Sequence, residues 1–143
     1  MIRRADKRDF DSVYQMINAL EACEFSKDKF MCIFEEIMSS EHHIIFLFEQ
    51  DHEVLGMLHL RMENQLHHCG KIAEIMELIV HERHRSEGIG KQLLSAACNY
   101  AKSCSCIQIE VTSNCKRKNA HCFYLKNDMQ QTHCKFTKSL EIS

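Results

Sequence analysis

Proline is absent from this chain of 143 residues, and glycine occurs only four times. Both residues mark loops and linkers, so their scarcity leaves no candidate domain boundary along the sequence. No apolar run approaches the ~20 residues of a membrane-spanning helix, and the first residues lack the apolar segment of a signal peptide. We therefore expect a single domain, residues 1–143, that is cytoplasmic and has no membrane partner.

An excess of one charge is also lacking. The formal net charge is −2, with 18 basic and 20 acidic residues, so we expect no nucleic-acid partner. Nine cysteines are present, but their number is odd and no C-x-x-C pair occurs. This pattern is more typical of reduced thiols than of a disulfide framework or a zinc site.

Hydrophobic periodicity is present along the whole chain and predicts a mixed α/β protein. Apolar or alternating runs predict six strands, over residues 2–5, 43–48, 54–62, 72–80, 107–111 and 131–137. Helical spacing predicts four helices, the first capped by Asp6, the second capped by Ser26, and the others over residues 88–102 and 117–126. The resulting order is strand, two helices, three strands, helix, strand, helix, strand.

The most informative segment joins the fourth predicted strand to the third predicted helix. It consists of Arg85, Ser86, Glu87, Gly88, Ile89, Gly90 and Lys91. A turn that opens a helix presents free backbone N–H groups and the positive end of the helix dipole. Gly88 and Gly90 would let a pyrophosphate approach the main chain closely, and Arg85 and Lys91 would add positive charge. The spacing matches neither G-x-G-x-x-G nor a P-loop, which argues against a dinucleotide fold and against phosphoryl transfer. A plain strand-to-helix turn is the alternative.

With these residues the chain resembles the GCN5-related N-acetyltransferase (GNAT) superfamily, whose Arg/Gln-x-x-Gly-x-Gly/Ala signature corresponds to Arg85, Gly88 and Gly90. The resemblance implies an α/β GNAT fold, with a mixed central sheet of six to seven strands and about four helices. It also implies that the backbone amides of the turn hold the pyrophosphate of acetyl-CoA, the cosubstrate. The other residues that it assigns to the coenzyme are Leu78, Ile79 and Val80, at the edge of the preceding strand, and Asn119.

The motif Ala120-x-x-Phe123-Tyr124 lies on the last predicted helix, where its three residues share one face. A packing stripe explains Ala120 and Phe123, whereas a buried Tyr124 hydroxyl needs a partner. Superfamily members have a tyrosine here beside the thioester sulfur, so the resemblance implies that Tyr124 protonates the leaving thiolate as general acid. Asp128 and Met129 stand where the superfamily has glycine and an aromatic residue. Because Asp tolerates left-handed backbone geometry, the turn after the helix is expected to survive.

Two glutamates of the fourth predicted strand are candidate bases. Acetyl transfer needs a neutral amine, but an alkylamine is mostly protonated at pH 7, and a carboxylate in an apolar setting is suited to remove the proton. Glu77 lies between Met76 and Leu78, and Glu74 precedes it by three positions. In a regular strand the two would point to opposite faces, whereas a bulge, which superfamily members carry here, would bring them together. A structural ion pair is the alternative for either residue.

The chain resembles one branch more closely, the aminoalkylphosphonate N-acetyltransferases. This resemblance rests on His67 and His68, Glu74 and Glu77, residues 112–114, Lys116 and Arg117, residues 120–125, His133 and residues 136–138. It implies an aminoalkylphosphonate acceptor, with His67 and His68 against the substrate and Lys116 and Arg117 on the phosphonate. The alternatives for the two cations are solvated surface or the 3′-phosphate of CoA. A divalent metal also stays open, and it would require the two histidines to lie in a loop.

Other functions remain open at this point. A neighbouring enzyme would acetylate an aminoglycoside or a polyamine, and such cationic acceptors would want an acidic pocket. A non-catalytic sensor of acyl-CoA would need neither Tyr124 nor Glu77. We expect direct attack of a small primary amine on the thioester, because no motif places a cysteine as nucleophile. A homodimer is a further expectation, since superfamily members often dimerise, but no interface is indicated.

Overall fold

The computed structural model describes residues 1–141, and contacts divide the chain into two compact units, Met1–Val111 and Thr112–Ser143. Within residues 1–141, the first unit holds the five strands and the first three α-helices, and the second unit holds the fourth. No helix within residues 1–141 combines the length and the apolar character that crossing a bilayer requires.

A five-stranded mixed sheet forms the centre of the first unit. Its strands are β1 (Ile2–Arg4), β2 (His43–Gln50), β3 (Glu53–Gln65), β4 (Gly70–Val80) and β5 (Gln108–Val111). They lie in chain order, and each neighbouring pair is antiparallel except β4 and β5, which are parallel. The predicted mixed α/β class is therefore confirmed.

The predicted count of six to seven strands is too high for the part of the chain described. The strand expected over residues 131–137 does not form, and this segment is irregular and exposed. A strand needs a neighbour that satisfies its backbone N–H and C=O groups, and within its own unit this segment has no strand to pair with among the described residues. Its apolar Phe136 is 92% exposed, so no buried face holds it in register either.

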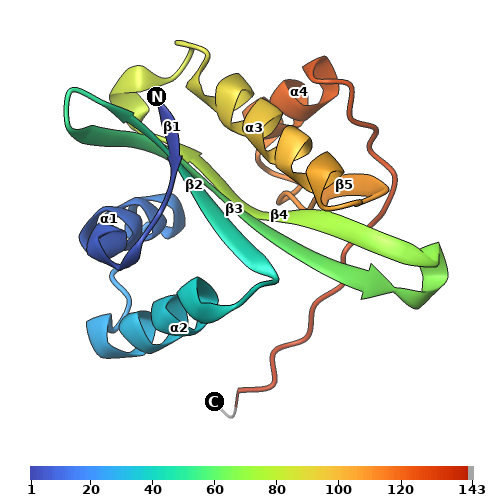
Figure 1. Cartoon of the computed structure of the whole chain (residues 1–143), viewed down its shortest axis with the longest axis horizontal. Helices are drawn as coiled ribbons and strands as arrows, with labels where there is room; N and C mark the ends of the chain where they lie inside the picture. Colours follow the sequence, from blue (N-terminus) through green and yellow to red (C-terminus); the bar gives the residue numbers. More distant parts are fainter. Residues whose placement is uncertain (142–143) are drawn as a thin grey trace. The chain divides into compact units, whose positions relative to one another are not determined.

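Two helices pack on one face of the sheet (Figure 1). They are α1 (Phe10–Glu21), which follows the short 3₁₀ helix η1 (Lys7–Asp9), and α2 (Lys27–Ser39). Asp6 caps η1, and the Ser26 hydroxyl accepts a hydrogen bond from the N–H of Lys29 at the start of α2. The core on this face consists of Phe10, Val13, Met16, Phe34, Ile45, Leu47, Met57 and Ile79. The predicted cap at Ser26 is confirmed, whereas Asp6 caps η1 rather than α1 itself, whose N-cap residue is Asp9.

The third helix, α3 (Ile89–Ser103), packs on the opposite face (Figure 1). It lies very close to β3 at Gly56, where a Cβ atom would come within 3.0 Å of Ile89 Cγ2 and 3.1 Å of Leu93 Cδ1. Leu93 has no exposed surface, and the rings of Tyr100 and Phe46 meet edge to face. Helix and strand are in contact here because residue 56 has no side chain.

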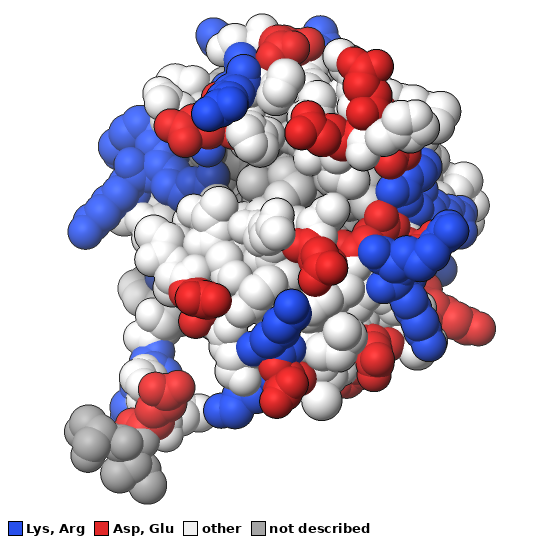
Figure 2. Space-filling view, turned by 90° about the vertical axis from the view of Figure 1, so that its left-hand side faces the viewer, with Lys and Arg blue, Asp and Glu red and all other residues white. Residues whose placement is uncertain are grey.

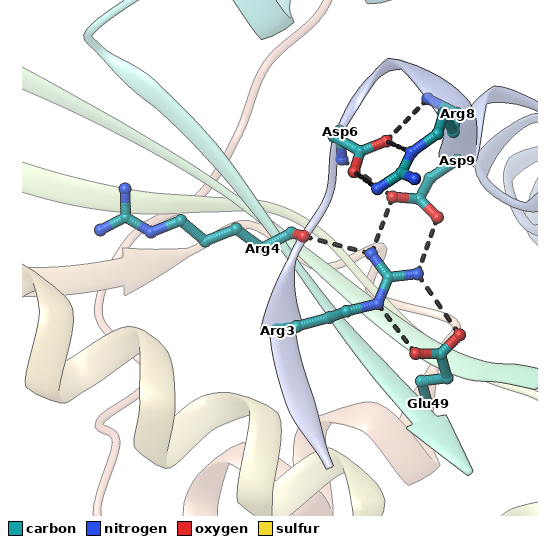
Figure 3. Close-up of polar contacts among 6 residues, drawn as sticks. All are labelled: Arg3, Arg4, Asp6, Arg8, Asp9 and Glu49. Carbon is teal, nitrogen blue, oxygen red and sulfur yellow. Dashed lines mark hydrogen bonds and ion pairs between the residues drawn. The ribbon is translucent and has the colours of Figure 1, made fainter. Parts of the chain in front are cut away.

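An ion cluster ties β1, η1 and β2 together (Figure 3). The Arg3 guanidinium donates to both carboxylate oxygens of Asp9, at 2.8 and 2.9 Å, and its Nε donates to Glu49 at 2.9 Å. The Asp9 carboxylate also accepts from the N–H of Asp6, which closes a capping box. Arg3 lowers the pKa of the Asp9 carboxyl below its usual range. This cluster fixes the start of α1 against the sheet.

The second unit contains α4 (Lys118–Lys126). Before it, the Asn114 side chain accepts from the N–H of Lys116, and the Asn114 carbonyl accepts from His121. After it, Asp128 adopts φ +66°, as predicted for the turn that lacks the usual glycine. The last described residues, 129–141, form no helix or strand.

Candidate active site

The turn before α3 has the backbone geometry of an anion site. Ser86 and Gly88 both have positive φ, at +71° and +83°, and Gly88 is the N-cap of α3 without a side-chain cap. A Cβ on Gly88 would meet no atom within 4 Å, so the backbone angle rather than space calls for glycine. The N–H groups of residues 86–91 donate to no acceptor within residues 1–141. Several donors are therefore available at the positive end of a helix.

The charged side chains of this turn are only partly free. Arg85 Nε donates to the carbonyl of Val80 at 3.4 Å, which links the turn back to β4. The carboxylate of Glu87 is held by His84 Nδ1 at 2.9 Å, so its negative charge has a partner beside the amide groups. Lys91 is exposed and forms no ion pair with any described residue.

The second half of β4 has a neighbour on one side only. β5 pairs with β4 over Ile72–Ile75, whereas β3 continues to pair with it up to Val80. The main chain from Met76 to Val80, which includes Leu78 and Ile79, therefore presents an open edge where β5 ends. An extended amide-bearing ligand can add hydrogen bonds to such an edge.

A bulge in β4 determines where its two glutamates point. His59 of β3 pairs with Glu77, but the next residue of β3, Leu60, pairs with Ile75, so Met76 is the extra residue. Arg61 then pairs with Glu74. Because β3 has no extra residue between positions 59 and 61, these two positions share a face, and Glu77 and Glu74, which pair with them, share that face too. The bulge expected from the resemblance is present.

Glu77 ends a hydrogen-bonded chain that crosses three strands. His59 Nδ1 lies 2.7 Å from Glu77 Oε2, and His59 Nε2 lies 2.8 Å from His43 Nδ1. The His59 side chain is 6% exposed, whereas Glu77 keeps 33% of its surface. Burial is the main cause that lowers the pKa of His43 below its ordinary value, and the neighbouring His59 lowers it further. The middle member of the chain is thus enclosed, and both of its ring nitrogens have partners.

Glu74 has a different partner. Its Oε1 accepts from Arg61 Nη2 at 2.7 Å, and the same nitrogen lies 3.4 Å from Glu63. The two glutamates of β4 are therefore unequal: one forms an ion pair with a permanent cation, and the other is bound by a histidine.

A cavity of about 90 Å³ lies between α1, α2 and the sheet. Its lining consists of Val13, Ile17, Phe30, Ile33, Phe34, Ile37, Ile45, Met57, His59 and Glu77. Figure 2 looks onto the side of α1 and α2, and uncharged side chains occupy much of the middle of that view. Glu77 is the only Asp, Glu, Lys or Arg of the lining, and eight of the other nine lining residues are apolar, the exception being His59.

His67 and His68 lie away from regular strands, in the 3₁₀ helix η2 (Leu66–His68) between β3 and β4. Their rings are 4.3 Å apart, and His68 Nδ1 contacts Gln65 Oε1 at 2.8 Å. His67 is exposed. Across the described residues, no group of three or more His, Cys, Asp or Glu side chains gathers as a metal site would require.

In the second unit, burial raises the pKa of the Tyr124 phenol, and the Arg117 charge opposes this rise. Tyr124 is partly buried on α4, while Lys116, Arg117 and Asn119 are exposed around the start of that helix. Arg117 is the N-cap residue and makes no side-chain cap. The predicted placement of the basic residues at the helix start is therefore seen.

Sequence reasoning missed His43 and His59. One signal was available: His59 interrupts an apolar run and shares its face with Met57, so a buried imidazole was to be expected there. Its partners were not predictable, because they depend on the pairing of β3 with both neighbours. The irregularity at Phe48 and Glu49 of β2 shifts the register between β2 and β3, and so changes which residues of the two strands are paired.

Comparison with known proteins identifies the class. Residues 10–129 match the acetyltransferase (GNAT) family. The chain therefore belongs to the GNAT family, and it is an N-acetyltransferase that uses acetyl-CoA as cosubstrate.

Particular relatives narrow the comparison. The chain is 37% identical over 139 residues to aminoalkylphosphonate N-acetyltransferase of Salmonella typhimurium, covering 97% of this chain and 90% of that protein. A crystal structure of a transcriptional regulator from Bacillus halodurans is similar with TM-score 0.90 and 23% identity, covering 98% and 99% of the two chains. An aminoglycoside N-acetyltransferase, AAC(6′)-Iy, in complex with CoA is similar with TM-score 0.88 and 15% identity, covering 99% and 95%. The two structures support the GNAT fold.

Proposed function

We propose that this enzyme transfers the acetyl group of acetyl-CoA to the primary amine of a small aminoalkylphosphonate. The observation that carries the choice of acceptor is the relative of that name, which aligns with nearly the whole chain. The observation that supports the chemistry is a single carboxylate residue, Glu77, in a cavity lined otherwise by His59 and eight apolar residues.

Glu77 acts as the general base. A primary ammonium must lose a proton before its nitrogen can attack the thioester carbon, and a carboxylate with a free oxygen is suited to accept it. Glu77 Oε2 is bound by His59, and Oε1 has no hydrogen-bond partner among the described residues. Glu74 is the weaker candidate, because Arg61 already occupies its Oε1 at 2.7 Å and would compete with the amine for the carboxylate. Glu74 then balances the charge of Arg61.

Tyr124 acts as the general acid. The carbon–nitrogen bond forms as the carbon–sulfur bond breaks, and the phenol gives its proton to the departing thiolate. Because burial raises the pKa of Tyr124, its hydroxyl stays protonated over a wider pH range than that of an exposed tyrosine. Attack is direct, so no cysteine forms an acyl-enzyme.

The turn and the open strand edge bind the coenzyme. The pyrophosphate accepts hydrogen bonds from the amides of residues 86–91, and the pantetheine arm pairs with the edge from Leu78 to Val80. Lys116 and Arg117 bind the phosphonate, with His67 and His68 as further contacts to the acceptor, and Asn119 contacts the coenzyme. The exposure of both cations on a short basic segment supports their assignment to an anion.

The acceptor is tested by thiol release from acetyl-CoA with a matched set of amines, each with and without a divalent cation. Aminomethylphosphonate, glycine and methylamine share one carbon next to nitrogen and differ in the acidic group, so their relative kcat/KM values isolate phosphonate recognition. We expect aminomethylphosphonate to lead. Equal values for phosphonate and methylamine would contradict phosphonate recognition while leaving the acetyltransferase class intact.

A variant pair locates the phosphonate. Lys116→Gln with Arg117→Gln should raise KM for aminomethylphosphonate and leave KM for methylamine unchanged, whereas Lys126→Gln, at the other end of α4, serves as the matched control. A rise in KM for acetyl-CoA instead would assign the two cations to a phosphate of the coenzyme.

A second acceptor class is favoured by the cavity itself. No Lys or Arg contributes to its lining, whereas a carboxylate and eight apolar side chains do. An aliphatic diamine or polyamine would place a cationic nitrogen at Glu77 and methylene groups on the apolar wall. Spermidine in the same assay separates the two classes, since only the phosphonate enzyme would discriminate against it.

We also propose a cytoplasmic location. All nine cysteines are free in the structure, and reduced thiols persist in a reducing compartment. Cell fractionation of the tagged protein tests this.

A further inference from the structure

His59 is the one buried histidine of the sheet, and it lies between two titratable groups rather than against a backbone carbonyl. Its Nδ1 contacts Glu77 at 2.7 Å and its Nε2 contacts His43 at 2.8 Å. His59 also lines the cavity, together with Glu77. The three side chains come from three adjacent strands, β2, β3 and β4.

The contacts determine which nitrogen carries each proton. An ionised carboxylate only accepts hydrogen bonds, so His59 Nδ1 must carry a proton. If His59 is neutral, its Nε2 is then an acceptor, and His43 Nδ1 must carry the proton between the two rings. With both rings neutral, both imidazoles are Nδ1–H tautomers, and both hydrogen bonds point toward Glu77.

We propose that His59 is a positioning residue for the general base: it holds the Glu77 carboxylate by one oxygen, orients it toward the cavity, and is itself oriented by His43. This inference rests on the proposed role of Glu77 as base. His59 takes no proton from the substrate in this scheme. It prevents the carboxylate from rotating away and leaves the second oxygen for the amine.

The surroundings give this arrangement a pH dependence. On the strands, the charged or titratable groups facing the chain are Glu74 and Arg61, with His42 beside His43. From α1 and α2, only apolar side chains line the cavity: Val13, Ile17, Phe30, Ile33, Phe34 and Ile37. A proton added to the two rings would place a positive charge beside Glu77, and no helix residue of the lining would balance it. Such a charge makes the carboxylate a weaker base.

Two substitutions at one position separate orientation from titration. His59→Asn places an amide N–H near the position of Nδ1, so it keeps the bond to Glu77 but cannot be protonated. His59→Leu removes the donor. We expect kcat to fall by about tenfold to a hundredfold in His59→Leu, as for other misplaced catalytic groups, and much less in His59→Asn. KM for acetyl-CoA should not change in either.

The pH profile carries the decisive readout. In the wild type, kcat should decrease as the pH is lowered through the range in which the histidine pair gains a proton. In His59→Asn, this decrease should occur at lower pH. His52→Asn, in the exposed β2–β3 turn, is the matched control and should retain the wild-type profile. Circular dichroism of each variant monitors folding.

A measurement on the wild-type protein tests the proposal even if the variants fail to fold. Nitrogen-15 NMR of the histidine rings should show His59 and His43 as Nδ1–H tautomers near neutral pH. The opposite tautomer at His59 would overturn the proposal. So would a His59→Leu enzyme with wild-type kcat and pH profile, provided that Glu77→Gln is impaired. If Glu77→Gln itself keeps full turnover, the proposed base is wrong and the positioning role fails with it.

Discussion

Alternate side chains of β3 point to opposite faces of the sheet, and the two sets of side chains have different surroundings. Toward α3, the strand presents Gly56, Leu58 and Leu60, and both leucines have no exposed surface. Toward α1 and α2, it presents His59 and Arg61, which bind the two glutamates of β4. The first face is apolar along β3, whereas the second combines an apolar core with paired polar groups and a cavity.

The difference between the two faces shows that β3 packs against α3 with one set of side chains and contributes polar groups to the candidate site with the other. Apolar side chains on the α3 face need no hydrogen-bond partners, so helix and sheet can pack at close range. On the other face, buried polar groups are costly unless they are paired. Both ring nitrogens of His59 have partners, whereas Arg61 pairs through Nη2 and its buried Nε has no partner among the described residues. We therefore expect substitutions on the α3 face to affect stability, and those around the cavity to affect turnover.

The largest effect on stability is expected for Leu58→Ala. Its side chain is fully buried, and removing it leaves a cavity in a face that is fixed by the contact between Gly56 and α3. Such losses amount to about 2–5 kcal/mol. Urea unfolding measured by circular dichroism checks the value. A loss below about 1 kcal/mol, smaller than usual for a buried leucine, would mean that this face repacks easily and that the contrast between the faces is wrong.

A smaller loss is expected for Gly56→Ala. The new Cβ would lie 3.0 Å from Ile89 Cγ2, 3.1 Å from Leu93 Cδ1 and 3.2 Å from the Ile79 carbonyl oxygen, so α3 must move away. Overpacking of this kind costs about 1–3 kcal/mol. Gly70→Ala is the matched control, because its Cβ would meet only Ile107, a 64% exposed side chain that can turn away. Equal losses at both glycines would remove the argument for tight packing at α3.

The buried histidine pair should make the free energy of unfolding depend on pH. Because burial lowers the pKa of His43 in the folded protein, the unfolded chain binds more protons between that pKa and the ordinary value of about 6.5. Folding stability is therefore fully present above about pH 6.5 and falls as pH drops through this window. His43→Asn keeps an amide N–H near the position of Nδ1 as a donor for His59 but does not titrate, so its stability should fall less.

The expected difference between wild type and His43→Asn in the slope of stability against pH is below about 1.4 kcal/mol per pH unit, the limit for one proton. Urea midpoints at about pH 5.5 and about pH 7.5, on either side of the ordinary histidine pKa, measure it. Parallel pH dependence in the two proteins would show that His43 titrates as an ordinary exposed histidine and that the pair is not enclosed.

The smallest effect on stability is expected for Ile33→Ser, at the rim of the cavity on α2. This side chain is 58% exposed, so its loss should change the free energy of unfolding by no more than about 0.5 kcal/mol. KM for the acceptor amine should nevertheless change, because Ile33 lines the cavity. An unchanged KM for every amine tested would indicate that acceptors do not use this wall.

Much of the fold was predictable because it depends on local pattern. The caps at Asp6 and Ser26 and the strand-to-helix turn at Gly88 follow from residue types that favour one backbone conformation. The strand predicted over residues 131–137 failed for the opposite reason: a strand depends on a neighbour, and alternation in the sequence does not supply one. At the site, the expectation that a bulge joins Glu74 and Glu77 agrees with the register, but no pattern distinguished the two residues.

The sequence by itself determined the class of the protein, through a turn whose glycines and neighbouring elements can be recognised without knowing what lies opposite them. Tertiary structure alone decided which glutamate is paired with an arginine and which with a histidine. These partners come from other strands, and one extra residue in β4 reverses the face of every side chain beyond it. Local preferences act over a few residues, whereas the register between strands is a property of the whole sheet.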